Sequence, residues 1–304
     1  MAADHNNGAP GPSKLAPGLY VTATPIGNLA DITARALDVL AAADVIAAED
    51  TRRTARLLAH HGLTTPMTPY HDHNAARALP GILRRLRGGA SVALVSDAGT
   101  PLVSDPGYKL VRACLDEGIP VTPLPGASSV LAALVVSGLP AERFFFAGFL
   151  PPKTAGRKRV LGDIANVPGA LVFMESAKRL AVALVDMAGV LTSGEGQRQA
   201  VICREMTKKF EEVRRGSLAD LADHYKTAGA PKGEVTIVVA PGVPEPVDDG
   251  LLDKLLTAAL KNSTVRDAAN AVSKDTGLSR RRVYARALEL KPGHLSSRRK
   301  EKEK

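Results

Sequence analysis

The sequence "LVSDAGTPLVSDPGYKLV" at residues 94–111 joins a predicted strand to a predicted helix through a turn of small and polar residues. An apolar run at 92–95 leads into this turn, and apolar residues at helical spacing follow it from Tyr108 onward. The turn repeats itself, because Ser-Asp-Ala-Gly at 96–99 returns as Ser-Asp-Pro-Gly at 104–107. Such a strand-to-helix turn is typical of an open α/β sheet, in which ligands bind at the carboxyl ends of the strands.

The turn lacks the residue patterns that bind phosphate groups. Neither the phosphate-loop pattern G-x-x-x-x-G-K-[ST] nor the dinucleotide pattern G-x-G-x-x-G occurs in the chain. Backbone at Ala98 and Gly99 is open to a ligand, and the turn also offers hydroxyls and carboxylates: Ser96, Thr100, Ser104, Asp97 and Asp105. These groups suit a ligand with a flat base, a diol and a positive charge. The alternative is a tight connection in which Asp and Ser cap the helix.

Composition indicates two α/β domains of ordinary size and an additional segment. The chain has 304 residues, of which 45% are hydrophobic, with 27 Gly and 21 Pro. No apolar run reaches membrane-spanning length and the first 17 residues hold no signal core, so a cytoplasmic location is expected. Cys114 and Cys203 lie in apolar stretches, and the histidines at 60–61 and 71–73 lack a second ligand cluster. We therefore expect neither a disulfide nor a metal site.

Short apolar runs alternate with helical patterns, which predicts α/β layers. The predicted strands are Leu19–Ala23, Val45–Ala48, Val92–Val95, Val121–Leu124, Phe144–Ala147, Leu171–Met174, Val201–Cys203 and Val235–Val239. Gly138-Leu139-Pro140 interrupts the series, and "APGVPEPVDDG" at 240–250 has the composition of a linker. The predicted organisation is a disordered tail at 1–17, α/β domains at 18–138 and 139–242, a linker at 243–250, a small all-helical basic domain at 251–292 and a disordered tail at 293–304.

The positive charge is concentrated near the C-terminus. Residues 250–304 hold 14 Lys/Arg against 6 Asp/Glu, a balance of +8 out of a net +9 for the chain. A helix is predicted to start with a capping box at Thr264 and Asp267 and to stop at Gly277, and Ser279 to cap the next one. Two helices joined in this way resemble a helix-turn-helix, so we predict RNA contacts at Arg280, Arg281, Arg282 and Arg286. The alternative is a small packing domain with ordinary surface arginines.

Further stretches with polar residues lie at the ends of predicted strands. They are "TATPIGNLADI" (22–32), "AAEDTRRTARLL" (47–58), "PLPGASSVLAAL" (123–134), "FMESAKR" (173–179), "CREMTKKFEEVRRG" (203–216) and "GEVTIVV" (233–239). With the turn at 94–111, they resemble the RsmI family of the tetrapyrrole-methylase superfamily, in collinear order from about Leu19 to Val239. The resemblance implies a homodimer with S-adenosylmethionine in the cleft between two α/β domains. It also implies methylation of the ribose 2′-hydroxyl of a cytidine in 16S ribosomal RNA, at the decoding centre of the small ribosomal subunit.

The resemblance also implies which residues contact the cofactor. They are Pro25, Asp97, Ala98, Gly99, Thr100, Val103, Ser128, Ser129, Glu175, Met206 and Thr207. The chain departs from the family at Ala23 and Ala30, where glycine is common, and at Ser176-Ala177-Lys178, where Ala-Pro-His usually follows the glutamate.

Methylation of a ribose hydroxyl requires a group that accepts its proton or stabilises the alkoxide. Glu49 and Asp50 directly follow a predicted strand, and one of them is the predicted proton acceptor or orienting group. Arg52, Lys208 and Lys209 are predicted to contact phosphate or oxyanion. In the alternative interpretation, Asp50 only caps a helix over 51–60.

Few aromatic residues are available to stack on RNA bases, since the chain has five Tyr, six Phe and no Trp. We therefore expect electrostatic contacts with the RNA backbone to dominate. A second basic patch is predicted in a loop over 151–159: Lys153, Arg157, Lys158 and Arg159.

Two other functions compete with ribosomal RNA methylation. A tetrapyrrole methylase would have the same fold, but it has no need of basic C-terminal helices. The other is a nucleic-acid-binding protein without catalysis, in which the α/β part only senses a ligand.

Overall fold

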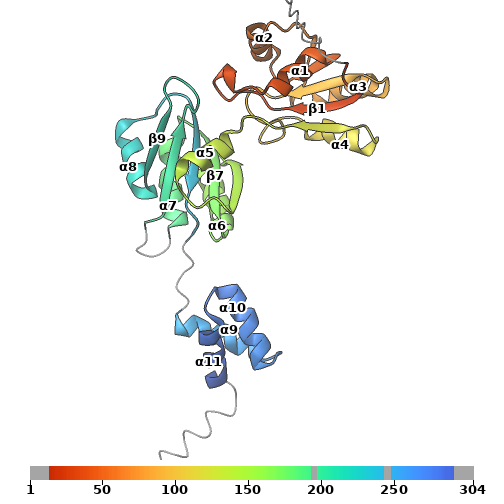
Figure 1. Cartoon of the computed structure of the whole chain (residues 1–304). Helices are drawn as coiled ribbons and strands as arrows, with labels where there is room; N and C mark the ends of the chain where they lie inside the picture. Colours follow the sequence, from red (N-terminus) through yellow and green to blue (C-terminus); the bar gives the residue numbers. More distant parts are fainter. Residues whose placement is uncertain (1–13, 193–196, 243–247, 291–304) are drawn as a thin grey trace, which may run out of the picture. The chain divides into compact units, whose positions relative to one another are not determined.

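The computed structural model describes residues 14–192, 197–242 and 248–290 (Figure 1). The chain divides into two compact units between residues 242 and 243. The first unit holds two five-stranded sheets, and the second holds three helices. Most of the two tails predicted to be disordered lies outside the described residues, as does most of the predicted linker. Among the described residues, no helix has the length and apolar character needed to cross a membrane.

The first sheet is entirely parallel, with the strand order β3-β2-β4-β1-β5. Its strands are β1 (Gly18–Thr22), β2 (Val45–Ala48), β3 (Met67–Pro69), β4 (Ser91–Val95) and β5 (Val121–Leu124). Its helices are α1 (Ala34–Ala42), α2 (Thr51–His60), α3 (Ala75–Arg87) and α4 (Tyr108–Asp116), with a 3-10 turn at Leu29–Asp31. Every residue of β2 and β4 is buried, because helices cover both faces of a parallel sheet.

The second sheet is mixed, with the order β6-β7-β10-β8-β9. Its strands are β6 (Phe144–Phe149), β7 (Ala170–Ser176), β8 (Gln199–Arg204), β9 (Glu212–Ser217) and β10 (Glu234–Val239). Only β6 and β7 run parallel, and the other neighbours are antiparallel. Leu171 and Phe173 pack with the helices α6 (Thr154–Ile164), α7 (Leu180–Leu191) and α8 (Leu218–Ala228). All eight predicted strands are confirmed, and the two-sheet α/β class with them.

Helix α5 (Ser129–Ser137) covers the other face of the second sheet. Its Val130, Ala133 and Leu134 pack with Val172 and Val201 of that sheet. The chain therefore crosses from the first sheet to the second before α5, whereas the sequence predicted a boundary near residue 138. Gly138 has a φ of 71° and ends α5 in the left-handed conformation, so the interruption marks a helix terminus.

The sequence prediction missed two strands and one helix. β3 and β9 lie at sheet edges, and their sequences, MTP and EVRRGS, carry no apolar run. The stretch 151–159 was predicted to be a loop, and this is wrong because α6 begins at Thr154. Its two prolines precede the helix and suggested a longer loop than the chain forms.

The second unit consists of α9 (Asp249–Leu260), α10 (Val265–Thr276) and α11 (Arg280–Leu290) around a small apolar core. The predicted capping box is confirmed, since Thr264 Oγ1 lies 3.2 Å from the Asp267 amide and 2.6 Å from its carboxylate. Gly277 ends α10 with a φ of 69°, as predicted. Helix α9 begins inside the predicted linker, because the Asp248 carboxylate accepts a hydrogen bond from the Leu251 amide.

Candidate active site

Two hydrogen bonds tie the glycine-rich turn after β4 to the loop after β1. The amides of Thr24 and Gly99 each donate to the other residue's carbonyl, both at 2.9 Å. Gly99 has a φ of 84°, which favours glycine, and Leu102 and Ser104 also have positive φ values, of 73° and 64°. Positive φ values at residues other than glycine store strain, which is common at ligand sites. The alternative, in which Asp and Ser cap the helix, is wrong, because α4 begins at Tyr108 and its N-cap residue in the described chain is Gly107, with no side-chain cap.

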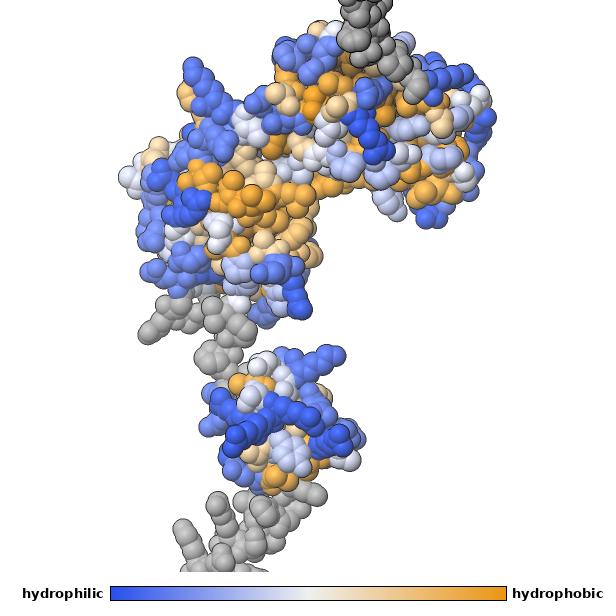
Figure 2. Space-filling model, viewed as in Figure 1, coloured by the Kyte–Doolittle hydropathy of each residue, from blue (hydrophilic) through white to orange (hydrophobic). Residues whose placement is uncertain are grey.

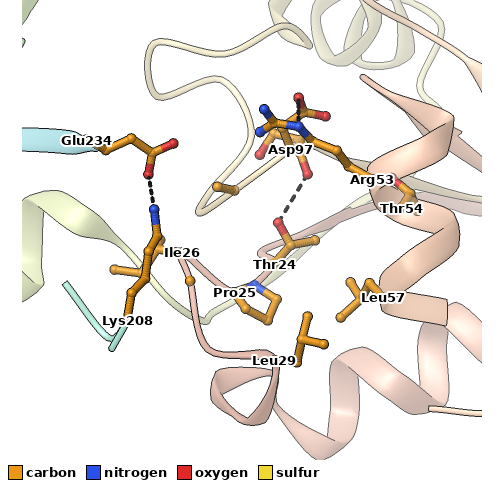
Figure 3. Close-up of a pocket in the computed structure, with 13 residues that line it drawn as sticks. Thr24, Pro25, Ile26, Leu29, Arg53, Thr54, Leu57, Asp97, Lys208 and Glu234 are labelled. Carbon is orange, nitrogen blue, oxygen red and sulfur yellow. Dashed lines mark hydrogen bonds and ion pairs between the residues drawn. The ribbon is translucent and has the colours of Figure 1, made fainter. Parts of the chain in front are cut away.

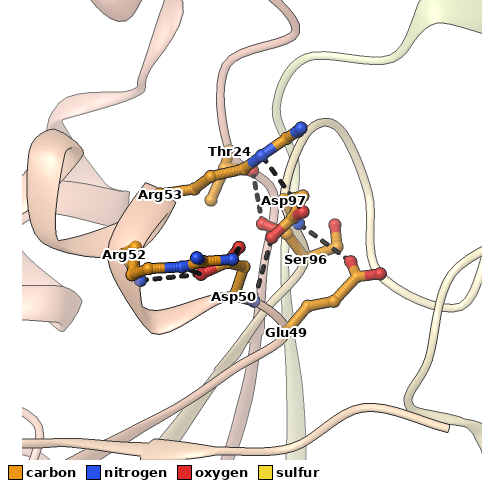
Figure 4. A network of polar contacts seen from close by, with 7 residues as sticks. All are labelled: Thr24, Glu49, Asp50, Arg52, Arg53, Ser96 and Asp97. Carbon is orange, nitrogen blue, oxygen red and sulfur yellow. Dashed lines mark hydrogen bonds and ion pairs between the residues drawn. The ribbon is translucent and has the colours of Figure 1, made fainter.

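Carboxylates from β2 and β4 form a hydrogen-bonded network at the carboxyl edge of the first sheet (Figure 4). The Asp50 amide donates to Asp97 Oδ1 at 2.9 Å, and the Asp97 amide donates to Glu49 Oε2 at 3.0 Å. Arg53 Nε lies 3.4 Å from the other Asp97 oxygen. Burial raises the pKa of Glu49 above its ordinary value, although the Asp97 amide opposes that effect.

Asp50 and Arg52 are engaged with each other. Asp50 caps α2 by accepting from the Arg52 amide at 2.9 Å, and the Arg52 guanidinium lies 2.9 Å from its second oxygen. These contacts, led by the side-chain hydrogen bond from Arg52, lower the pKa of Asp50 to about 2. The helix predicted at 51–60 is confirmed, and Asp50 has the capping role of the alternative interpretation.

The loop after β1 meets the loop after β8, which joins the two α/β halves (Figure 3). The Asn28 amide donates to Thr207 Oγ1 at 3.1 Å, and a Cβ atom on Gly27 would lie 2.5 Å from Lys208 Cγ. Lys208 Nζ lies 2.9 Å from carboxylate oxygens of both Glu205 and Glu234. Lys208, a predicted oxyanion partner, is therefore neutralised by two carboxylates.

Two adjoining cavities lie between the halves, with volumes of about 680 and 210 Å³. Both are lined by Ile26, Arg53, Asp97, Ala98 and Glu234, so they form one cleft. The larger volume is typical of a small-molecule site.

A buried glutamate forms part of the wall of the larger cavity. Glu175 lines that cavity and is 2% exposed. Its Oε1 accepts from the Ser176 amide and from Arg179 Nε, both at 2.7 Å, whereas Oε2 has no hydrogen-bond partner within the described residues. A buried acceptor needs a donor. The amino and hydroxyl groups of S-adenosylmethionine are such donors, so the residues present fit that cofactor.

The cleft collects most of the residues predicted from the family resemblance. The larger cavity is lined by Glu49, Asp97, Ala98, Ser129, Glu175 and Met206, and the smaller by Pro25 and Lys208 as well. Thr100 lies beside it, and its hydroxyl donates to the Ala127 carbonyl. Eight of the residues predicted for catalysis or cofactor binding line neither cavity: Asp50, Arg52, Gly99, Thr100, Val103, Ser128, which caps α5, Thr207 and Lys209, whose ammonium lies 5.6 Å from the Phe210 ring.

The lining residues of the larger cavity that the sequence prediction missed include Arg53, Asp105, Phe149, Lys178 and Lys232. Asp105 stands in the turn that the sequence singled out, and Lys178 stands where the chain departs from the family. Asp105 differs from the other carboxylates in its surroundings, since burial, together with the negative charges of Glu49, Asp97 and Asp72, raises the pKa of its carboxyl to about 6. No local signal marks Phe149 or Lys232.

The predicted RNA contact at Arg157 is wrong. The side chain is 2% exposed, its Nε donates to Asp186 Oδ2 at 2.7 Å, and it also donates to the Pro151 and Pro152 carbonyls. Arg157 is therefore a structural residue that joins α6 to α7. The other members of the predicted patch, Lys153, Lys158 and Arg159, are exposed.

The four arginines of α11 differ in their surroundings. Arg286 makes two hydrogen bonds to Asp253, at 2.6 and 2.7 Å, and Arg282 lies 3.1 Å from Asp249. Arg280 and Arg281 are exposed and have no ion pair within the described residues. Residues 248–290 hold eight Lys/Arg and six Asp/Glu, so acidic residues offset much of the basic charge of this unit.

The two-sheet fold and its cleft place the chain among the methylases. The family described as Tetrapyrrole (Corrin/Porphyrin) Methylases matches residues 18–222, and the RsmI C-terminal HTH domain matches residues 246–291. Solved structures share the fold. A cobalt precorrin-4 methyltransferase has 18% identity and a TM-score of 0.54, covering 73% of this chain and 94% of that one. A uroporphyrin-III C-methyl transferase from Thermus thermophilus, complexed with S-adenosylhomocysteine, has 20% identity and a TM-score of 0.53, covering 73% and 96%.

Curated relatives show to which family among these methylases the chain belongs. A ribosomal RNA small subunit methyltransferase I from Mesorhizobium japonicum is 50% identical over 277 residues, or 91% of this chain and 93% of the relative. Those from Vibrio cholerae and Escherichia coli O157:H7 are 44% and 43% identical, and each match covers about nine tenths of both chains. The chain belongs to the tetrapyrrole methylase family and, within it, to the family of ribosomal RNA small subunit methyltransferase I.

Proposed function

We propose that the protein transfers a methyl group from S-adenosylmethionine to the ribose 2′-hydroxyl of a cytidine in the decoding region of 16S ribosomal RNA. Its family membership supports the reaction class and the ribosomal RNA substrate. The observation that carries the proposal is a cavity of about 680 Å³ beside the glycine-rich turn, whose wall includes Glu175, a buried glutamate with one carboxylate oxygen unpartnered within the described residues. The RsmI C-terminal domain favours an RNA substrate over a tetrapyrrole, and the methylase family favours an enzyme over a binding protein without catalysis.

The cofactor would be held by the cleft residues that the resemblance assigns to it: Pro25, Asp97, Ala98, Gly99, Thr100, Ser129, Glu175 and Met206. When bound, S-adenosylmethionine supplies a methyl carbon attached to a positively charged sulfur. The carboxylates of Asp97 and Glu175 favour a positive charge in a cleft of low dielectric constant. Val103, Ser128 and Thr207 remain proposals that rest on the resemblance alone.

The hydroxyl proton needs an acceptor at the cavity wall. Asp50 is engaged with Arg52, and Glu49 Oε2 accepts from the Asp97 amide. Asp105 lines the larger cavity and makes no ion pair within the described chain, and the Ser96 hydroxyl is its hydrogen-bonding neighbour. We therefore assign proton acceptance to Asp105 and a supporting electrostatic role to Glu49. Lys209 was also predicted to contact phosphate or oxyanion. This role remains a proposal that no contact in the cleft supports.

The reaction is tested by incubating the protein with labelled S-adenosylmethionine and small ribosomal subunits. Label in the ribose of a single cytidine is the expected result. Valine at Gly99 should abolish it and weaken cofactor binding at least tenfold, because a β-branched residue is strained at a φ of 84° and reshapes the turn. Space is not the obstacle, since the nearest atom to a Cβ there is 3.5 Å away.

Gly118→Val is the matched control for that variant. Gly118 has a φ of 67° and follows α4 outside both cavities, so the substitution adds similar strain without touching the cleft. Equal cofactor affinity in the Gly99 and Gly118 variants, measured by calorimetry, would remove the turn from the site. Label on a tetrapyrrole and none on ribosomal RNA would favour the competing methylase function.

We propose that α11 contacts RNA through Arg280 and Arg281, and that Arg282 and Arg286 mainly hold α11 against α9. Changing Arg280 and Arg281 to Gln should weaken RNA binding and lower the slope of log affinity against log salt by about 0.7–0.9 for each lost phosphate contact. The corresponding Arg282/Arg286 variant should bind RNA more nearly like the unchanged protein and melt at a lower temperature. Equal losses of RNA affinity in both variants, measured by salt titration, would contradict the distinction.

A homodimer and a cytoplasmic location complete the proposal. Helix α5 packs one face on the second sheet and exposes apolar side chains on the other, with Leu131 54% and Val135 82% exposed. Figure 2 shows apolar surface around the position that α5 has in Figure 1. An exposed apolar patch of this kind supports an interface between two copies. A ribosomal RNA substrate supports the cytoplasmic location.

A further inference from the structure

We propose that one edge of the second sheet is a nucleotide subsite, in which Phe149 stacks on an unstacked RNA base and Lys178 and Lys232 bind the flanking phosphates. The inference rests on the proposed function and deepens it, because it identifies how the cleft holds the nucleotide to be methylated. All three residues line the larger cavity.

The sheet topology brings these residues to the same end of three neighbouring strands. Strands β6, β7 and β10 are neighbours, and Phe149 is paired in register with Met174 of β7. Lys178 follows the end of β7, and Lys232 precedes β10, which runs antiparallel to β7. Since neighbouring strands lie about 4.8 Å apart, the three segments span roughly 10 Å. That is a suitable width for a single nucleotide.

Phe149 is placed as a stacking platform. Its side chain is 58% exposed at the cavity wall, whereas Phe146 of the same strand packs against the core under α5. A phenylalanine ring that is half exposed inside a cleft contributes little to the core and presents its face to a ligand. Proteins that bind single-stranded RNA stack bases on such rings.

The two lysines carry positive charge without a carboxylate partner among the described residues. The other cations near the cleft are paired: Arg53 with Asp97, Arg179 with Glu175, and Lys208 with Glu205 and Glu234. Lys178 and Lys232 are therefore the cavity cations with charge available to a phosphate group.

The opposite wall of the cavity repels phosphate. Glu49, Asp97 and Asp105 reach it from the first sheet. A nucleotide would therefore enter with its phosphates toward the lysines and its ribose toward the carboxylates. This orientation brings a ribose hydroxyl to the wall that holds Asp105.

Variants of the full-length protein test the subsite. The probe is a single-stranded oligoribonucleotide with one pyrrolocytidine, whose fluorescence reports base stacking. Phe149→Leu should weaken binding by roughly 5- to 150-fold and abolish the fluorescence change, since stacking on an aromatic ring contributes about 1–3 kcal/mol per base. Phe149→Tyr should restore both. Gln at Lys178 and Lys232 should lower the affinity and its salt dependence while a fluorescence change persists at saturation.

Phe145→Leu is the matched control, because Phe145 is 41% exposed on the same strand but lines neither cavity. Cofactor binding by calorimetry serves as the second readout and should be unchanged in all variants. Equal effects of the Phe145 and Phe149 changes, or loss of cofactor affinity in Phe149→Leu, would overturn the subsite. Failure of the unchanged protein to bind the oligoribonucleotide would also overturn the subsite, whereas failure to methylate small ribosomal subunits would contradict the proposed function itself.

Discussion

Replacing Arg157 with alanine is expected to lower the free energy of unfolding by about 3–5 kcal/mol. The guanidinium is 2% exposed and lies against Asp186, which is itself 5% exposed. Removing it leaves a buried carboxylate without its main partner, and it also leaves the Pro151 and Pro152 carbonyls without their donor. Urea denaturation of the variant and the unchanged protein measures the difference.

Two controls separate this role from RNA binding. Lys158→Ala changes an exposed neighbour that lies 3.6 Å from the same carboxylate, and it should alter stability by less than about 0.5–1 kcal/mol. The double variant Arg157→Met with Asp186→Leu should recover most of the lost stability, because an apolar pair of similar volume needs no charge partner. A fully stable Arg157→Ala protein with weakened RNA binding would reverse this assignment.

The strands that could be predicted from the sequence are those buried within the sheets. β2 and β4 are covered on both faces, so each is a continuous apolar run. β9 is an edge strand whose sequence, EVRRGS, keeps only Ser217 buried, and it therefore carries no such signal. The boundary predicted near Gly138 has a related cause. Glycine and proline are found both where a helix ends and where one domain gives way to the next, so the local sequence does not distinguish the two.

The site was predictable where its residues share one local motif. The turn at 96–100 contributes Asp97 and Ala98 to the cleft because all its residues follow one strand. Strand pairing between distant segments brings Phe149 beside Met174, and no local pattern contains that information. The distinction between Glu49 and Asp50 also required the structure, since neighbouring residues at a strand end point in different directions.

Replacing Asp105 with asparagine is expected to slow methyl transfer by about 10²–10⁴-fold, the usual contribution of a positioned proton acceptor. In the proposed step, the Asp105 carboxylate would accept the hydroxyl proton, and bound S-adenosylmethionine would supply the methyl group that the ribose oxygen receives. An amide has no carboxylate to receive the proton, although it has nearly the same shape.

The pH dependence follows from the surroundings of Asp105. Burial and the negative charges of Glu49, Asp97 and Asp72 together raise the pKa of its carboxyl to about 6, against the opposing hydrogen bond from the Ser96 hydroxyl. The acceptor is the deprotonated form, so the rate should fall as pH drops through about 6 and level off above about 7. The asparagine variant should lose this acidic limb. Carboxyl titration by NMR offers a readout independent of activity, and the resonance with a midpoint near pH 6 should be absent in the variant.

Two neighbouring carboxylates provide matched comparisons for Asp105. Glu49→Gln removes one of the negative charges that raise the Asp105 pKa, so it should shift the acidic limb toward lower pH and change the rate at pH 7.5 far less than Asp105→Asn. Asp50→Asn should leave the pH profile in place, because Asp50 caps α2 and asparagine caps a helix nearly as well. Calorimetry must show unchanged cofactor affinity in all three variants. If Asp105→Asn retains the rate and the acidic limb while Glu49→Gln loses both, then Glu49 is the proton acceptor and Asp105 only shapes the turn.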